Sequence, residues 1–176
     1  MSEFNSINSI VELAPSIITG SMAVAGIIYA NWHNAKMAKI NAAKEFSKRK
    51  LDKIEELYLV LSQYKKYVLK ISLSHTTFYA GHLTRQELQA QLDECKTGQS
   101  FDLVNARMLV DVYFDEIKPQ FEVLDKAWGE LAPLFLLEAN STNSRDAVIN
   151  VMAKQEAFEQ VCDKLLIQLG RLAKNL

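Results

Sequence analysis

The chain has 176 residues, of which 49% are hydrophobic, six are glycine and three are proline. The apolar share excludes a disordered protein, and the shortage of turn-forming residues argues against an all-β fold. The net charge is −1, yet residues 36–70 hold ten basic and four acidic residues, whereas residues 1–35 contain no lysine or arginine. We therefore expect an all-α protein with a basic band near its N-terminus.

The first predicted element is a segment from Leu13 to Ala35 that contains no Asp, Glu, Lys or Arg. A helix of this length spans about 30 Å, the thickness of the hydrocarbon core of a bilayer. Tyr29 and Trp32 lie near its C-terminal end, where aromatic rings favour lipid headgroups. The sequence therefore predicts a short extracytoplasmic N-terminus at residues 1–12 and one transmembrane helix at residues 13–35.

Basic side chains follow the predicted span at once, in a juxtamembrane helical segment at residues 36–53. Basic residues close to a span stay on the cytoplasmic side and are attracted to anionic lipid. The protein is therefore expected in the cell membrane, with its N-terminus outside and its C-terminal domain in the cytoplasm. The predicted contacts to lipid headgroups are Lys36, Lys39, Lys44, Lys48, Arg49 and Lys50.

Three other interpretations of residues 13–35 compete with the transmembrane helix. A cleaved signal peptide needs a basic N-terminal region, but Glu3 and Glu12 stand there. An interfacial helix needs a charged face, which the segment lacks. A buried core helix of a soluble protein stays open as an alternative, because small and polar residues dilute the isoleucines and valines of the segment.

Small residues within the predicted span recur four positions apart, as Ser16 with Gly20 and Ser21 with Ala25. This spacing lets two helices approach closely in lipid. The sequence leaves two hypotheses open, self-association through these four residues and simple anchoring of one chain.

The remaining residues, 54–176, carry three apolar stripes with alternating steps of three and four, a pattern typical of helices that pack against other helices. The stripes are Ile54, Leu57, Leu61, Tyr64, Val68 and Ile71; Val110, Phe114, Ile117, Phe121, Leu124, Trp128, Leu131 and Phe135; and Val148, Val151, Gln155, Phe158, Cys162, Leu165, Leu169, Leu172 and Leu176. They predict an antiparallel bundle of three to four helices, or a coiled-coil-like domain, in the cytoplasm.

The last stripe is the candidate interaction stripe, represented by Val148, Phe158, Cys162, Leu165, Leu169 and Leu172. A heptad pattern determines the face of a helix that is covered, but not which chain supplies the covering helix. Pairing within one chain is favoured here, because the other two stripes provide matching faces of similar length.

Helix-breaking residues predict where the bundle helices begin and end. Gly81 interrupts the first stripe, and Thr84 with Glu87 forms a capping box for a short helix that ends near Cys95.

Two prolines fall inside the second stripe. We expect a kink or break near Pro119 and Pro133, because each lacks a backbone donor. A loop is predicted at residues 139–144, where Asn, Ser and Thr cluster.

No constellation of residues indicates an enzyme. Cys95 and Cys162 are isolated and fit ordinary helix positions in a reducing compartment. His75 and His82 lack a metal-ligand motif and are expected at the surface or at its boundary. The sequence contains no phosphate-binding glycine loop and no G-x-S-x-G motif. We therefore predict no catalytic activity, no cofactor and no metal.

The predicted function is that of a single-pass membrane-anchored helical interaction module, such as a scaffold, adaptor or accessory subunit. Membrane lipids are its expected partners; the protein partner is unknown, and self-association into a homo-oligomer is open. Nucleic acid is not expected, since Phe46 is the one aromatic residue in the basic segment. The alternative is an oligomerising membrane effector, of the toxin-like, phage-exclusion or abortive-infection type, that perturbs the membrane through its transmembrane helix.

Overall fold

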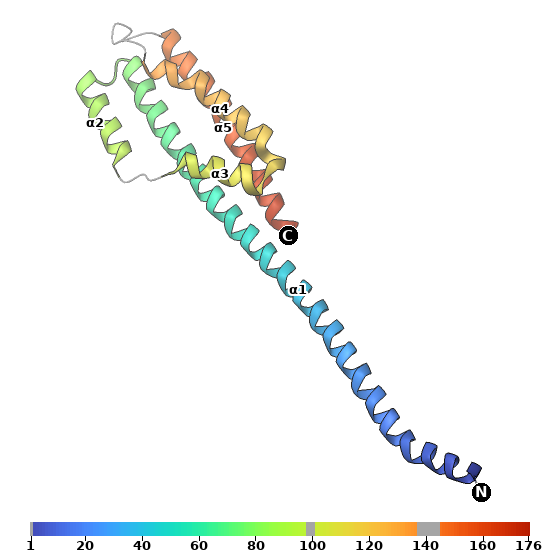
Figure 1. The fold of residues 1–176 in the computed structure, drawn as a ribbon. Coiled ribbons are helices and arrows are strands. Elements are labelled where there is room, and N and C mark those ends of the chain that lie inside the picture. Colours follow the sequence, from blue (N-terminus) through green and yellow to red (C-terminus); the bar gives the residue numbers. More distant parts are fainter. Residues whose placement is uncertain (1, 98–100, 137–144) are drawn as a thin grey trace. The chain divides into compact units, whose positions relative to one another are not determined.

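The computed structural model describes the backbone of residues 2–97, 101–136 and 145–176, and the side chains of these ranges from residue 22 onward. Within them the protein contains five α-helices, two short 3-10 helices and no strand, so the all-α fold class is confirmed (Figure 1). The elements are α1 (Ser2–Tyr79), α2 (Arg85–Lys96), α3 (Leu103–Tyr113), η1 (Asp115–Ile117), α4 (Lys118–Leu131), η2 (Ala132–Leu136) and α5 (Arg145–Lys174).

The chain divides into two compact units, residues 1–48 and residues 49–176. The first unit is the N-terminal part of α1. The second unit contains the rest of α1 and all the other helices, and it includes the predicted bundle domain at 54–176.

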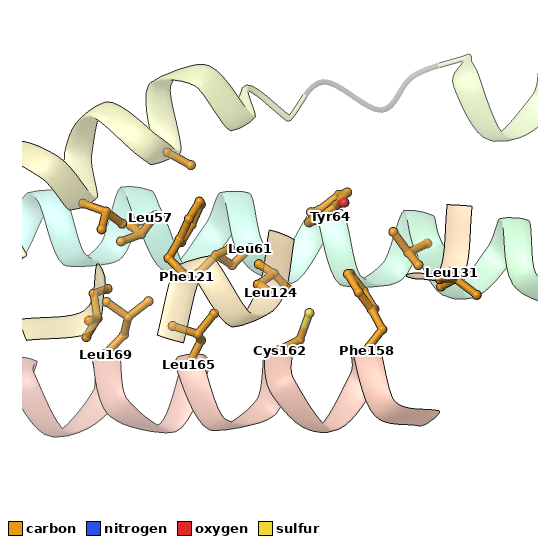
Figure 2. Packing of buried hydrophobic residues seen from close by; sticks show 14 of the residues in the cluster. Leu57, Leu61, Tyr64, Phe121, Leu124, Leu131, Phe158, Cys162, Leu165 and Leu169 are labelled. Atoms are coloured by element: carbon orange, nitrogen blue, oxygen red, sulfur yellow. The ribbon is translucent and has the colours of Figure 1, made fainter. Parts of the chain in front are cut away.

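One hydrophobic core lies between α1, α4 and α5 in the second unit (Figure 2). Figure 2 shows Leu61 of α1, Leu124 of α4 and Leu165 of α5 meeting in this core, where all three are buried. Burying one such side chain contributes roughly 1.5–3 kcal/mol. The predicted helical bundle is therefore confirmed, and in this structure the apolar stripes pack against one another within one chain.

The helices α1 and α5 run antiparallel. Lys65 Nζ lies 3.0 Å from Glu159 Oε1 and 2.7 Å from Asp163 Oδ1. Further along α1, Leu73 lines a hollow together with Ile149, which stands near the start of α5. Higher residue numbers on α1 therefore face lower residue numbers on α5, which means that the two helices run in opposite directions.

The end of α1 and the start of α2 follow the predicted local chemistry. Helix α1 ends at Tyr79, and Gly81 adopts a φ of 79°, which a residue with a Cβ rarely tolerates. The capping box is present: the Thr84 N–H donates to Glu87 Oε2 at 2.8 Å, and the Glu87 N–H donates to Thr84 Oγ1 at 3.3 Å.

The second apolar stripe spans several elements instead of one helix. Pro119 lies in the first turn of α4, and Pro133 lies in η2, directly after α4 ends. A break near each proline is therefore confirmed. The loop predicted at residues 139–144 lies outside the described residues.

Residues 13–35 are helical, as expected for the predicted span, because they belong to α1. In the part of the chain whose side chains are described, no helix combines the length and the apolar character needed to cross a membrane. The side chains of residues 13–21, the first part of the predicted span, lie outside that part. The transmembrane helix therefore stays a prediction.

Candidate functional site

Apolar side chains are exposed on all sides of α1 in the first unit. Between residues 22 and 32, large hydrophobic side chains are 57–72% exposed; they are Met22, Val24, Ile27, Ile28, Tyr29 and Trp32. Successive residues of a helix point about 100° apart, so these six positions cover roughly two thirds of the circumference of α1, and the exposed Ala23 and Ala30 occupy the remaining arc. A helix that is hydrophobic all round needs cover on every side.

An aromatic cluster stands at the C-terminal end of this apolar stretch. The ring of Tyr29 lies 6.2 Å from the ring of Trp32 and 6.2 Å from that of His33, measured between centroids. Lys36 Nζ lies 5.3 Å from the centroid of the Trp32 ring, a cation–π contact. Rings with an apolar body and a polar edge, next to a lysine, are typical of the boundary between hydrocarbon and water.

The predicted headgroup-binding residues divide between the two units. Lys36, Lys39, Lys44 and Lys48 are exposed on the first unit, and we call these four residues the lysine collar. Arg49 and Lys50 belong to the second unit, where Arg49 is exposed.

Lys50 contacts other residues of the bundle. Its Nζ lies 3.4 Å from Glu116 Oε1 and 5.8 Å from the centroid of the Phe114 ring. Its charge is therefore already engaged within the second unit.

The small residues predicted to pack between spans all belong to α1. Ser16, Gly20 and Ser21 fall in the helical backbone of α1, but their side chains lie outside the described residues. Ala25 is exposed on α1.

The candidate interaction stripe of α5 lies in the core of the bundle. Phe158, Cys162, Leu165 and Leu169 are fully buried, and Val148 and Leu172 are partly buried against the core. In this fold these side chains stabilise the chain itself, and a partner would have to contact other residues.

Two shallow hollows between α1 and α5 expose apolar side chains that the sequence did not single out. One, of about 520 Å³, is lined by Leu73, Ile149 and Met152, all of them exposed. The other, of about 340 Å³, is lined by Tyr58, Leu59 and Gly170. Leu59, Lys66 and Leu73 follow one another at seven-residue steps on the outer side of α1, and this spacing is the signal that could have identified the face.

A further hollow of about 540 Å³ separates α3 from α4. Its floor is apolar and includes Phe121 and Leu124. Its rim carries an ion pair between Arg107 and Asp125. Asp111, the other carboxylate of its lining, pairs with Lys118.

His75 is buried, so its predicted place at the surface or its boundary is wrong. It is 6% exposed, and its ring stacks on Phe135 at 4.7 Å between centroids. Burial lowers the pKa of His75 to about 4, which keeps the imidazole neutral at neutral pH. No described residue hydrogen-bonds its Nδ1, whereas His82 is exposed.

The cysteines are unsuited to nucleophilic chemistry. Cys95 and Cys162 are both buried and free. Burial raises the pKa of Cys162 to about 12, so this thiol stays protonated.

Metal-ligating side chains do not gather in groups of three or more anywhere in the described part of the chain. The exposed apolar stretch of α1 and the lysine collar are therefore the features with the clearest functional meaning.

No family model matches the chain, and no curated protein or solved structure is detectably similar to it.

Proposed function

We propose that the protein is a single-pass membrane-anchored helical interaction module without catalytic activity. Residues 13–35 of α1 act as the anchor, the lysine collar sets the orientation, and the bundle presents its surface to a protein partner on the cytoplasmic side. The observation that carries this proposal is the exposure of apolar side chains, the small Ala23 and Ala30 among them, on all sides of α1 between Met22 and Trp32.

Lipid is favoured over a single protein helix as the cover for this stretch. One partner helix covers one stripe, whereas hydrocarbon covers every side at once. Each large apolar side chain gains roughly 1.5–3 kcal/mol on leaving water, so the six between Met22 and Trp32 together offer on the order of 10 kcal/mol.

The lysine collar supports the predicted orientation. Its four ammonium groups follow the aromatic cluster and are exposed. Each basic residue near an anionic membrane surface contributes about 1 kcal/mol, and basic residues beside a span keep their flank in the cytoplasm.

An interaction role for the bundle is supported by what its surface offers. The hollows of the second unit are lined by apolar side chains and by charged groups such as Asp111 and Asp125 that pair with Lys118 and Arg107. Such surfaces favour docking of another helix over the binding and activation of a substrate.

Membrane fractionation tests the anchor. The full-length protein should remain in the membrane pellet after washing with alkaline carbonate. Replacing Ile27 and Ile28 together with lysine should release it, because each lysine inside a span costs up to about 2.5–3.5 kcal/mol. Val104→Lys with Val123→Lys, at two exposed positions of the bundle, is the matched control and should stay in the pellet.

Recovery of the wild-type chain in the soluble fraction would overturn the anchor. Collapse of the membrane potential on overexpression would instead favour the oligomerising effector. Protease added to intact cells should leave the bundle uncut; cleavage there would reverse the proposed orientation.

A further inference from the structure

The outer side of α1 carries an exposed stripe with a basic centre. Leu59, Lys66 and Leu73 are seven residues apart, so they lie on one face of the helix, and all three are exposed. Between Leu59 and Leu73 the helix contains three lysines and no acidic residue.

The neighbouring stripe on α5 has the same layout with the opposite charge. Ile149, Glu156, Asp163 and Gly170 are also seven apart and exposed. Its centre is therefore acidic, and its two ends are apolar or small. In the described residues Lys66 and Glu156 form no ion pair.

The two stripes stand level with each other along the bundle. Leu73 lines one hollow with Ile149 and Glu156. Leu59 lines the other hollow with Gly170. Between the hollows, Lys65 forms ion pairs with Glu159 and Asp163 of the same chain. The basic centre of α1 therefore already pairs with the acidic centre of α5 within one chain.

We propose that this face of α1 and α5 binds a second copy of the chain, about a two-fold axis parallel to the two helices. Such an axis sets α1 of one copy on α5 of the other and keeps every residue at its own level. Lys66 then faces Glu156 and Asp163 of the partner subunit, Leu59 enters the hollow at the partner subunit's Gly170, and Leu73 packs beside the partner subunit's Ile149.

Charge selects this axis over the other one that the face allows. A two-fold axis perpendicular to the helices would set α1 on α1, bringing Lys66 of both copies together, and α5 on α5, bringing the acidic centres together. The parallel axis also places residue 49 of both copies at the same end of the dimer, which suits two chains anchored in one membrane. The pairing itself does not depend on that anchor.

A substitution at Gly170 tests the interface. A Cβ added at Gly170 meets nothing within 4 Å, and Gly170 is exposed, so a side chain can be added there without a clash at its Cβ. Gly170→Phe would then place a ring in the hollow that Leu59 of the second copy would enter. In sedimentation of the full-length protein in mild detergent, dimerisation should weaken at least tenfold. Gly129→Phe is the matched control, because Gly129 is a helical glycine of α4 with equally open surroundings, and it should leave the dimer unchanged.

Charge reversal tests the axis. Lys66→Glu and Glu156→Lys should each weaken the dimer, and the two changes combined in one chain should restore it. Lys126→Glu, on an exposed position of α4, is the control and should leave the dimer unchanged.

Two results would overturn the interface: a monomeric wild type, or a dimer that survives both Gly170→Phe and Lys66→Glu. Failure of the combined variant to restore the dimer would overturn the parallel axis. Carbonate extraction of these variants reports on the anchor separately.

Discussion

Burial of His75 makes the stability of the bundle depend on pH. Its pKa falls from the ordinary value of 6.5 to about 4 because the imidazole is removed from water. The unfolded chain therefore takes up a proton below about pH 6.5, whereas the folded chain takes it up only below about pH 4. The free energy of unfolding is therefore highest above pH 6.5, where His75 is neutral in both states. It falls by up to about 3 kcal/mol as the pH is lowered to 4, because the unfolded chain then binds a proton that the folded chain does not.

His75→Phe should remove this part of the pH dependence. The phenyl ring keeps the stacking on Phe135 but cannot take up a proton. Thermal unfolding, followed by circular dichroism between pH 7.5 and pH 4.5, should show a smaller loss of melting temperature than in the wild type. His82→Phe, at an exposed position, is the control and should behave as the wild type. Equal losses in the wild type and His75→Phe would show that other groups cause the dependence.

The burial of His75 could have been inferred from spacing. His75 stands four residues after Ile71 and three before Phe78, so it continues the first apolar stripe. Residue type argued for the surface, because histidine is usually at least partly exposed. The periodicity of the stripe predicts the observed burial correctly, because all residues on the inward face of a helix point toward the core.

At the scale of single elements, the capping box decides how α2 begins. Thr84→Ala removes the oxygen that accepts from the Glu87 N–H, at a cost of about 1 kcal/mol. Amide hydrogen exchange in the first turns of α2 should then become roughly fivefold faster in the full-length protein. Thr84→Ser keeps the acceptor and should exchange as the wild type. Unchanged exchange in Thr84→Ala would mean that packing of Leu88, and not the cap, holds the start of α2.

The buried stripe of α5 should be required for folding. Leu169→Asp places a carboxylate in the core and loses roughly 1.5–3 kcal/mol of apolar burial, so the bundle should lose most of its helix content. Ile167→Asp, two residues earlier on the exposed face, should keep it. Circular dichroism of both full-length variants measures the difference. A Leu169→Asp chain as helical as the wild type would contradict the packing of α5 within one chain.

The second apolar stripe shows where element prediction from spacing fails. Ile117 and Phe121 keep the expected spacing and are buried, yet they lie in η1 and α4. The backbone leaves the helical conformation at Phe114, which has φ −138° and ψ 52°. The spacing of apolar residues therefore predicts which side chains are buried. It does not predict that the helix is continuous, because side chains on either side of a helix break can still point toward the core.

For the whole molecule, the division after Lys48 predicts that the second unit folds without the first. A fragment of residues 49–176 should be strongly helical, unfold in one cooperative transition and leave the membrane fraction. Circular dichroism with thermal unfolding and carbonate fractionation test these outcomes. A fragment that melts without a transition would show that residues 1–48 contribute to the core, and a fragment that stays with the membrane would place the lipid-binding surface on the bundle.

The sequence by itself determined the helical class of this protein, most of the buried faces and the start of α2. Steps of three and four from Ile54 to Ile71 specify one side of a helix, and Thr84 with Glu87 specifies a helix start, because both depend only on residues close in the chain. The tertiary structure alone decided which helix covers which, since any helix with a matching stripe can cover another. The tertiary structure also decided the register of α1 on α5, in which Lys65 pairs with Glu159 and Asp163. This register determines which outer face stays exposed, because a side chain is exposed only where no other helix covers it.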